Sequence, residues 1–149
     1  MIWKPHVTVA AVVERDQKFL MVEELADSRR VYNQPAGHLD EGESLLHAVV
    51  RETLEETAWT FTPTALVGIY RWRNPDNNAT YLRLCFSGDC DQHDPTRALD
   101  DGIVAALWLS RAELARSTRL RSPLVMRCID DYLAGIRYPL SLLTDIESG

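Results

Sequence analysis

The chain is poor in the features that mark secreted or membrane proteins. Its only cysteines are Cys85, Cys90 and Cys128, an odd number without the spacing of a metal site. Its first residues lack the apolar run that a secretory leader needs. No hydrophobic stretch approaches the length of a transmembrane helix. We therefore expect a cytoplasmic protein that neither depends on disulfides nor binds a membrane.

Positive charge is also scarce. The chain has 16 Lys and Arg against 22 Asp and Glu, for a net charge of -6. This balance gives no electrostatic basis for binding a nucleic acid polymer. Small phosphorylated substrates remain compatible with it, because a bound cation reverses the local field. We expect such a substrate, bound by a monomer or a small homo-oligomer.

Repeats, low-complexity segments and Gly/Ser-rich linkers are absent from the sequence as well. A length of 149 residues fits one domain with a substantial core. Hydrophobic residues make up 46% and charged residues 26%, as in ordinary globular proteins. We expect a single domain over residues 1–149.

The most informative feature present is an acidic helix within residues 37–59. Glu52, Glu55 and Glu56 are spaced i, i+3 and i+4, so they share one helical face. Ser44 stands where a helix cap is expected. The opposite side carries the residues expected to face the core, which are Leu46, Val49, Val50, Thr53 and Leu54.

Such a carboxylate row repels itself unless a cation neutralises it. Mg2+ prefers oxygen ligands and keeps part of its coordination shell for substrate phosphates. We interpret Glu52, Glu55 and Glu56 as metal ligands and catalytic residues of a reaction on a phosphate ester or anhydride, with Mn2+ as a substitute cation. The alternative is a solvated acidic face without a ligand.

Two neighbouring positions support this interpretation. Arg51 lies at the flank of the acidic face, and Glu43 is the obvious carboxylate for it to meet. That pair would hold the preceding loop against the helix, which gives both residues a supporting catalytic role. Gly37 opens the segment, where a residue without a side chain allows the backbone to approach a metal or phosphate closely.

The segment resembles the Nudix box, G-x5-E-x7-R-E-U-x-E-E-x-G-U with U aliphatic. Six charged or glycine positions of the box match at the right spacing. They are Gly37, Glu43, Arg51, Glu52, Glu55 and Glu56. Thr53, Ala58 and Trp59 depart from it, and none of these positions supplies a metal ligand. Ala58 replaces a glycine that favours a left-handed turn at the helix exit, so the departure concerns the geometry of that exit.

Segments outside the box, residues 4–10, 33–38, 120–125 and 137–140, resemble the NudJ-type phosphatases of this family. The resemblance implies hydrolysis of nucleoside tri- and diphosphates with release of orthophosphate. It also implies activity on thiamine-pathway diphosphates such as hydroxymethylpyrimidine diphosphate. Alternatives are a Nudix pyrophosphohydrolase of another nucleoside diphosphate-linked metabolite and a Nudix-fold ligand sensor without catalysis. The intact carboxylate set argues against the sensor.

Further site residues are harder to identify. Members of this family often take an additional acid from a separate loop, and Asp100 and Asp101 are the candidates by chain order. Arg29 and Arg71 are candidates for binding phosphate oxygens, and Trp72 for stacking on a substrate ring. For each of these residues, a structural or solvated role is the alternative.

The chain alternates β-rich and helical segments. Residues 7–13 and 19–22 are strand-like runs that we predict to form a hairpin around the turn at 14–18. Further strands are predicted near 31–33, 65–72, 80–86 and 103–109, with a mobile loop over 88–102. Helices are expected after Ser110 and from Ser122 toward Gly135. The order predicts an α/β fold, and the resemblance implies a Nudix-type α/β/α sandwich with a mixed β-sheet between helices.

Overall fold

Two β-sheets and three α-helices make up the fold in the computed structural model, which describes residues 1–147. The strands are β1 (His6–Val12), β2 (Glu14–Arg15), β3 (Lys18–Ala26), β4 (Arg29–Asn33), β5 (Ala36–His38), β6 (Thr60–Arg73), β7 (Thr80–Asp91) and β8 (Ile103–Ser110). The helices are α1 (Leu45–Thr57), α2 (Arg111–Arg116) and α3 (Leu124–Leu133), with a short 3-10 turn, η1, at Leu140–Leu142.

The first sheet has the strand order β5-β1-β7-β6 and is mixed, because β1 runs parallel to β7 while the other pairs are antiparallel. Its strand β1 is buried on both faces, which explains the continuous apolar run at this point of the sequence. Val9 and Ala11 contribute to one core cluster, and Ala10 and Val12 to the other.

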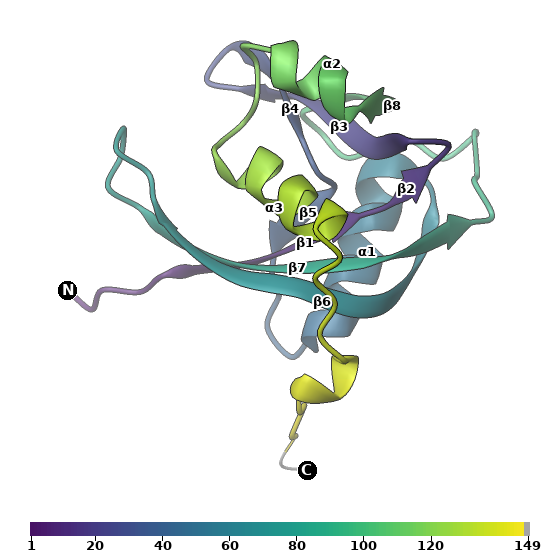
Figure 1. Ribbon diagram of the computed structural model, residues 1–149. Helices are drawn as coiled ribbons and strands as arrows, with labels where there is room; N and C mark the ends of the chain where they lie inside the picture. Colours follow the sequence, from purple (N-terminus) through teal and green to yellow (C-terminus); the bar gives the residue numbers. More distant parts are fainter. Residues whose placement is uncertain (148–149) are drawn as a thin grey trace.

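Helices cover both faces of this sheet. Ala48 and Val49 of α1 pack in the same cluster as Val9, whereas Val125 and Ile129 of α3 pack in the cluster of Ala10. Figure 1 shows α1 behind the sheet and α3 in front of it. The α/β class and the mixed sheet between helices are thus confirmed.

The second sheet was not anticipated as a separate unit. Strand β3 lies between β4 and β8 and also pairs with β2, and all these pairs are antiparallel. The predicted hairpin of residues 7–13 with 19–22 is therefore wrong, because β1 and β3 belong to different sheets. The turn at residues 16–17 instead joins β2 to β3 in a tight hairpin, with Asp16 and Gln17 at positive φ.

The remaining elements follow the sequence more closely. Ser110 and Glu113 form the expected capping box of α2, and α3 begins directly after Pro123. The predicted loop over 88–102 is shorter than expected, because β7 continues to Asp91 and pairs with β6 along its whole length. Within residues 1–147, no helix is both long and apolar enough to cross a membrane.

Candidate metal and substrate site

Helix α1 presents the acidic residues because both of its ends are fixed. The Ser44 side chain accepts a hydrogen bond from the His47 N–H, as a helix cap does. At the other end, Ala58 adopts the left-handed conformation with φ 63°, and its N–H bonds to the Leu54 carbonyl. The exit geometry that glycine would favour is therefore kept by an alanine.

Three carboxylates meet at the exposed side of α1. One oxygen each from Glu52, Glu55 and Asp100 lies within 4.8 Å of the others. Asp100 reaches this position because its own N–H donates to the Glu55 carbonyl at 3.0 Å, which ties the loop to the helix. The sequence offered both Asp100 and Asp101, and the structure brings Asp100 into the cluster. Asp101 is exposed and lies outside it.

Gly37 lies directly against this cluster. A Cβ atom placed on Gly37 would come within 2.1 Å of the Glu52 carboxyl carbon. Real side chains do not tolerate such a distance, so only glycine leaves room for the Glu52 carboxylate beside β5. The sequence suggested that a metal or phosphate approaches the Gly37 backbone closely. In the structure, the Glu52 carboxylate occupies that position.

We expect Gly37→Ala to lower activity much more than stability. The new methyl group would push the flexible end of the Glu52 side chain aside, without forcing the β5 backbone to move. A displacement of about 1 Å in a catalytic group costs roughly 100-fold in rate. Phosphate release and thermal unfolding of the same variant test this expectation, and a drop in melting temperature with normal activity would contradict it.

Glu56 is more buried than the helical pattern suggested. It is 8% exposed, and its Oε1 accepts a hydrogen bond from the Ala36 N–H at 2.9 Å. Burial raises the pKa of Glu56 to about 9, with the nearby charges of Glu24, Glu52 and Asp100 adding to the effect. The expectation of an exposed side chain was wrong because β5 lies over this part of α1. The Glu56 carboxylate is therefore next to the cluster, below its surface.

Arg51 and Glu43 form the pair that the sequence predicted. The Arg51 guanidinium donates through Nε to Glu43 at 2.6 Å and through Nη2 to the other Glu43 oxygen at 2.9 Å. It also donates to Glu52 at 2.8 Å, Glu55 at 3.2 Å and the His38 carbonyl at 3.1 Å. These contacts lower the pKa of Glu43 to about 2. Arg51 thus joins the loop, β5 and the acidic cluster.

The donor set suits a hard divalent cation. Carboxylate oxygens are the ligands that Mg2+ prefers, at about 2.1 Å from the ion, so its ligand atoms lie up to roughly 4.2 Å apart. The 4.8 Å limit on the Glu52, Glu55 and Asp100 oxygens needs only a small contraction to meet this geometry. Glu56 is a fourth acid next to these three. Its candidate ligand atom is the oxygen that does not accept from the Ala36 N–H.

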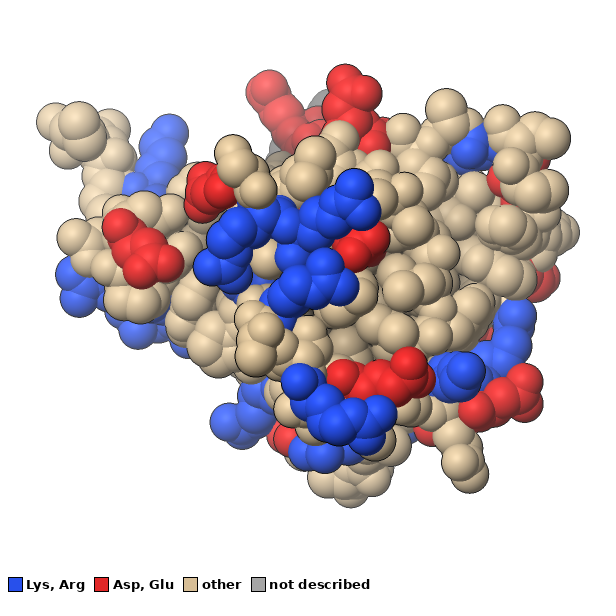
Figure 2. Space-filling model, turned by 90° about the horizontal axis from the view of Figure 1, so that it is seen from above, with Lys and Arg blue, Asp and Glu red and all other residues tan. Residues whose placement is uncertain are grey.

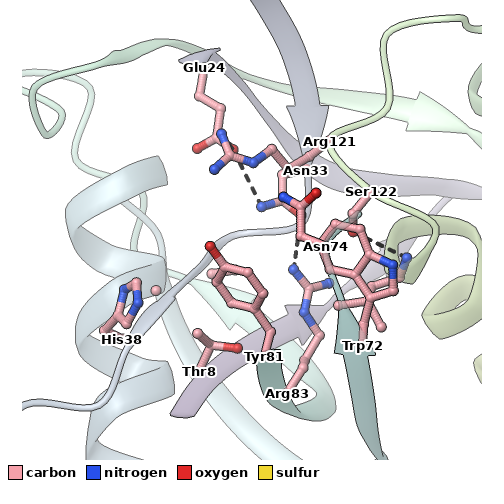
Figure 3. Close-up of a pocket in the computed structure, with 13 residues that line it drawn as sticks. Thr8, Glu24, Asn33, His38, Trp72, Asn74, Tyr81, Arg83, Arg121 and Ser122 are labelled. Carbon is pink, nitrogen blue, oxygen red and sulfur yellow. Dashed lines mark hydrogen bonds and ion pairs between the residues drawn. The ribbon is translucent and has the colours of Figure 1, made fainter. Parts of the chain in front are cut away.

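A pocket opens on the other side of β5. It encloses about 160 Å³, and its lining includes Gly37, which lies against Glu52, and Ala36, whose N–H donates to Glu56. Trp72, one of the substrate-binding residues named from the sequence, lines this pocket, and its ring stacks on Tyr81 with centroids 5.8 Å apart. Figure 3 shows both rings close to the guanidinium of Arg83.

Several lining residues were missed by the sequence analysis, chiefly Asn33, Tyr81, Arg83 and Arg121. One signal was available, since Arg83 interrupts the apolar run Leu82, Arg83, Leu84 in a central strand. The others are polar residues at strand ends or in loops, and only the tertiary fold brings them together.

Arg29 and Arg71 do not reach the pocket. Arg29 begins β4 opposite Ala26, at the exposed end of the β3–β4 pair. Arg71 is next to Trp72 on β6, where successive side chains point to opposite faces, and it is not among the residues that line the pocket. It borders a groove between β6 and α3 instead. Neither residue lines the pocket, and their role in substrate binding stays a prediction.

Basic and acidic residues are interleaved on the surface that includes the second sheet (Figure 2). Two ion pairs between β3 and the segment before α3 are examples, Arg119–Glu23 at 3.3 Å and Arg121–Glu24 at 3.8 Å. These two pairs neutralise part of the positive charge between β3 and that segment.

Comparisons with known proteins agree with this geometry. Residues 4–127 match the NUDIX domain family. Phosphatase NudJ of Escherichia coli (strain K12) is 41% identical over 146 residues, covering 98% of this chain and 95% of that protein. A solved NUDIX hydrolase from Nitrosomonas europaea is 52% identical with a TM-score of 0.91, covering 96% of this chain and 98% of that one. The NUDIX domain of Shewanella oneidensis NrtR, complexed with ADP ribose, shares the fold at 18% identity and a TM-score of 0.74, covering 90% of each chain.

Proposed function

We propose a substrate class and a cofactor for this chain from the premise that it belongs to the Nudix family, as a hydrolase that acts on phosphoanhydrides. Its proposed reaction is the Mg2+-dependent hydrolysis of nucleoside tri- and diphosphates with release of orthophosphate, with Mn2+ as a substitute cation. Thiamine-pathway diphosphates such as hydroxymethylpyrimidine diphosphate are proposed as further substrates. Similarity to phosphatase NudJ over 98% of the chain supports this choice.

The observation that carries the proposal is the meeting of Glu52, Glu55 and Asp100 beside a pocket that shares Gly37 with them. In our proposal these carboxylates and Glu56 hold the cation. The cation supplies charge neutralisation at the phosphate oxygens and a lowered pKa for water. Arg51 keeps Glu52 and Glu55 in place through its hydrogen bonds, and Glu43 orients Arg51.

The alternative within the family is a pyrophosphohydrolase of another nucleoside diphosphate-linked metabolite. Both reactions need the same carboxylates, so they differ in the bond that is cleaved. Incubation of the pure protein with Mg2+ and a panel of diphosphates, followed by mass analysis of the products, distinguishes them. We expect orthophosphate from nucleoside diphosphates. A nucleoside monophosphate formed only from conjugated diphosphates would favour the alternative, and no hydrolysis at all would contradict both.

Removal of the cation is expected to abolish the reaction and to lower stability. Glu52, Glu55 and Asp100 then lose their counterion and repel one another, apart from the contacts that Arg51 makes with the two glutamates. Ligand at 100 times its Kd stabilises a folded protein by about 2.7 kcal/mol, which for this chain length corresponds to roughly 5–10 °C in melting temperature. Activity and thermal unfolding with a chelator, and again after excess Mg2+ is added, measure both effects. Undiminished hydrolysis in the chelator would contradict a metal-dependent mechanism.

A further inference from the structure

A buried arginine without a charge partner lies at the floor of the pocket. Arg83 lies near the beginning of β7, opposite Thr8 of β1, and is 5% exposed. Its Nη1 donates to the Gln34 side-chain oxygen at 2.9 Å and its Nη2 to that of Asn33 at 3.1 Å. Its Nε is buried and has no hydrogen-bond partner. Over residues 1–147, no carboxylate forms an ion pair with it at 4.0 Å or less.

This arrangement is costly for the fold alone. A buried charge is normally paired, because its desolvation is not repaid by neutral groups. The amide oxygens of Asn33 and Gln34 accept two of the five guanidinium N–H groups, so most of its donor capacity is not used by them. Because Nε is itself buried, the N–H groups left on the two Nη nitrogens are the donors suited to an acceptor that enters the adjacent cavity.

The residues that line the pocket indicate which kind of ligand carries that acceptor. Trp72 presents an aromatic ring beside Arg83, which favours a flat ligand by stacking, while the ring of Tyr81 stacks on those of Trp72 and His6. Ligand sites for drug-sized molecules usually enclose about 300–1,000 Å³, so the 160 Å³ found here admits a ring but not a whole nucleotide. The phosphates would then extend past Gly37 toward the carboxylate cluster.

The pocket also contains the carboxylate of Glu24, which pairs with the lining residue Arg121 at 3.8 Å. Asn33 donates to the same carboxylate at 3.4 Å. An anionic phosphate next to Arg83 would share a small space with this carboxylate. The carbonyl oxygen of a neutral ring accepts hydrogen bonds without that repulsion. Figure 3 shows Glu24, Asn33 and Arg83 following one another along the pocket.

We propose that this pocket binds the base of a nucleotide substrate, with Trp72 stacking on the ring and Arg83 donating to a carbonyl oxygen at its edge. The inference rests on the proposed function, since it places the phosphoanhydride at the carboxylates. Arg83 is then a specificity-determining residue that acts on binding of the ring and not on the chemical step.

Arg83→Met tests the proposal with two substrates that share one type of bond, uridine diphosphate and methyl diphosphate. Hydrogen bonds to charged groups are worth about a tenfold to hundredfold change in binding. We expect KM for uridine diphosphate to rise by that factor with kcat nearly unchanged, and both constants for methyl diphosphate to stay the same. The melting temperature should be unchanged or higher, because the variant no longer buries an unpaired charge.

Two further variants complete the experiment. Arg116→Met makes the same replacement on the exposed surface of α2 and should alter neither substrate. Arg83→Lys keeps the charge but loses the planar donor fork, so it should also raise KM for uridine diphosphate alone. It serves as the test if the methionine variant does not fold. Equal losses on both diphosphates, or a fall in kcat alone, would overturn the proposal in favour of a structural or phosphate-binding role.

A binding measurement separates this inference from the proposed function. Uridine monophosphate should raise the melting temperature of the metal-free wild-type protein and have a weaker effect on Arg83→Met. If wild-type protein hydrolyses neither diphosphate but still shows this difference, the proposed function fails and the ring pocket stands. If uridine monophosphate stabilises both proteins equally, or neither, Arg83 does not recognise the ring.

Discussion

Glu56→Gln is expected to reduce hydrolysis by about 100-fold or more while the protein stays folded. Partners in the outer shell of a metal site are already worth about 10–100-fold in metal affinity or activity, so losing a carboxylate next to the cation should cost at least that. The fold should tolerate the change. Glutamine keeps an oxygen that accepts from the Ala36 N–H. Burial already raises the pKa of Glu56 to about 9, so the metal-free protein holds this group uncharged at neutral pH.

Phosphate release in excess Mg2+ and thermal unfolding with and without Mg2+ measure the two parts of this expectation. Wild-type protein should gain stability from the cation, and Glu56→Gln should gain much less. Without the cation, the variant should be at least as stable as wild type. Glu41→Gln, on the exposed loop before α1, is the matched control and should behave as wild type. Full activity of Glu56→Gln would show that the cation does not need this carboxylate.

The same residue shows how far the sequence could predict the site. The spacing of Glu52 and Glu55 follows from local helical geometry, and Glu43 is close enough in the chain to pair with Arg51 from the loop before α1. The burial of Glu56 depends on β5 lying over α1, which helical periodicity cannot indicate. The choice of Asp100 over Asp101 depends on one backbone hydrogen bond to Glu55, which neighbouring acids in a loop do not reveal.

The fold shows the same division between local and distant interactions. Helix α2 with its capping box and the β-rich runs were predictable, because helix caps and strand patterns depend on residues that are close together in the sequence. Strand partners were not, since β1 pairs with β7 about 75 positions later and β3 with β8 about 85 later. The same separation hid the pocket, where Asn33 and Arg83 come from different sheets.

Arg51→Ala is expected to impair stability and rate together, because Arg51 holds several acids at once. Its guanidinium is within 3.3 Å of carboxylate oxygens of Asp40, Glu43, Glu52 and Glu55. Removing one partner of a fully buried ion pair costs about 3–5 kcal/mol. With 20% of the Arg51 side chain exposed, we expect about 2 kcal/mol, or roughly 4–8 °C in melting temperature. The rate should fall about tenfold or more as Glu52 and Glu55 lose their hydrogen bonds.

Acid provides an independent check on this support role. Arg51 lowers the pKa of Glu43 to about 2 in the folded protein, below its ordinary value of 4.5. The stabilisation from the pair is therefore complete above pH 4.5 and is lost as the pH falls toward 2, so the difference in melting temperature between wild type and Arg51→Ala should shrink over that range. Arg111→Ala removes an exposed pair with Asp130 and should change the melting temperature little at any pH in this range. An unchanged melting temperature in Arg51→Ala, alongside lost activity, would mean that Arg51 acts on the substrate directly and does not support the carboxylates.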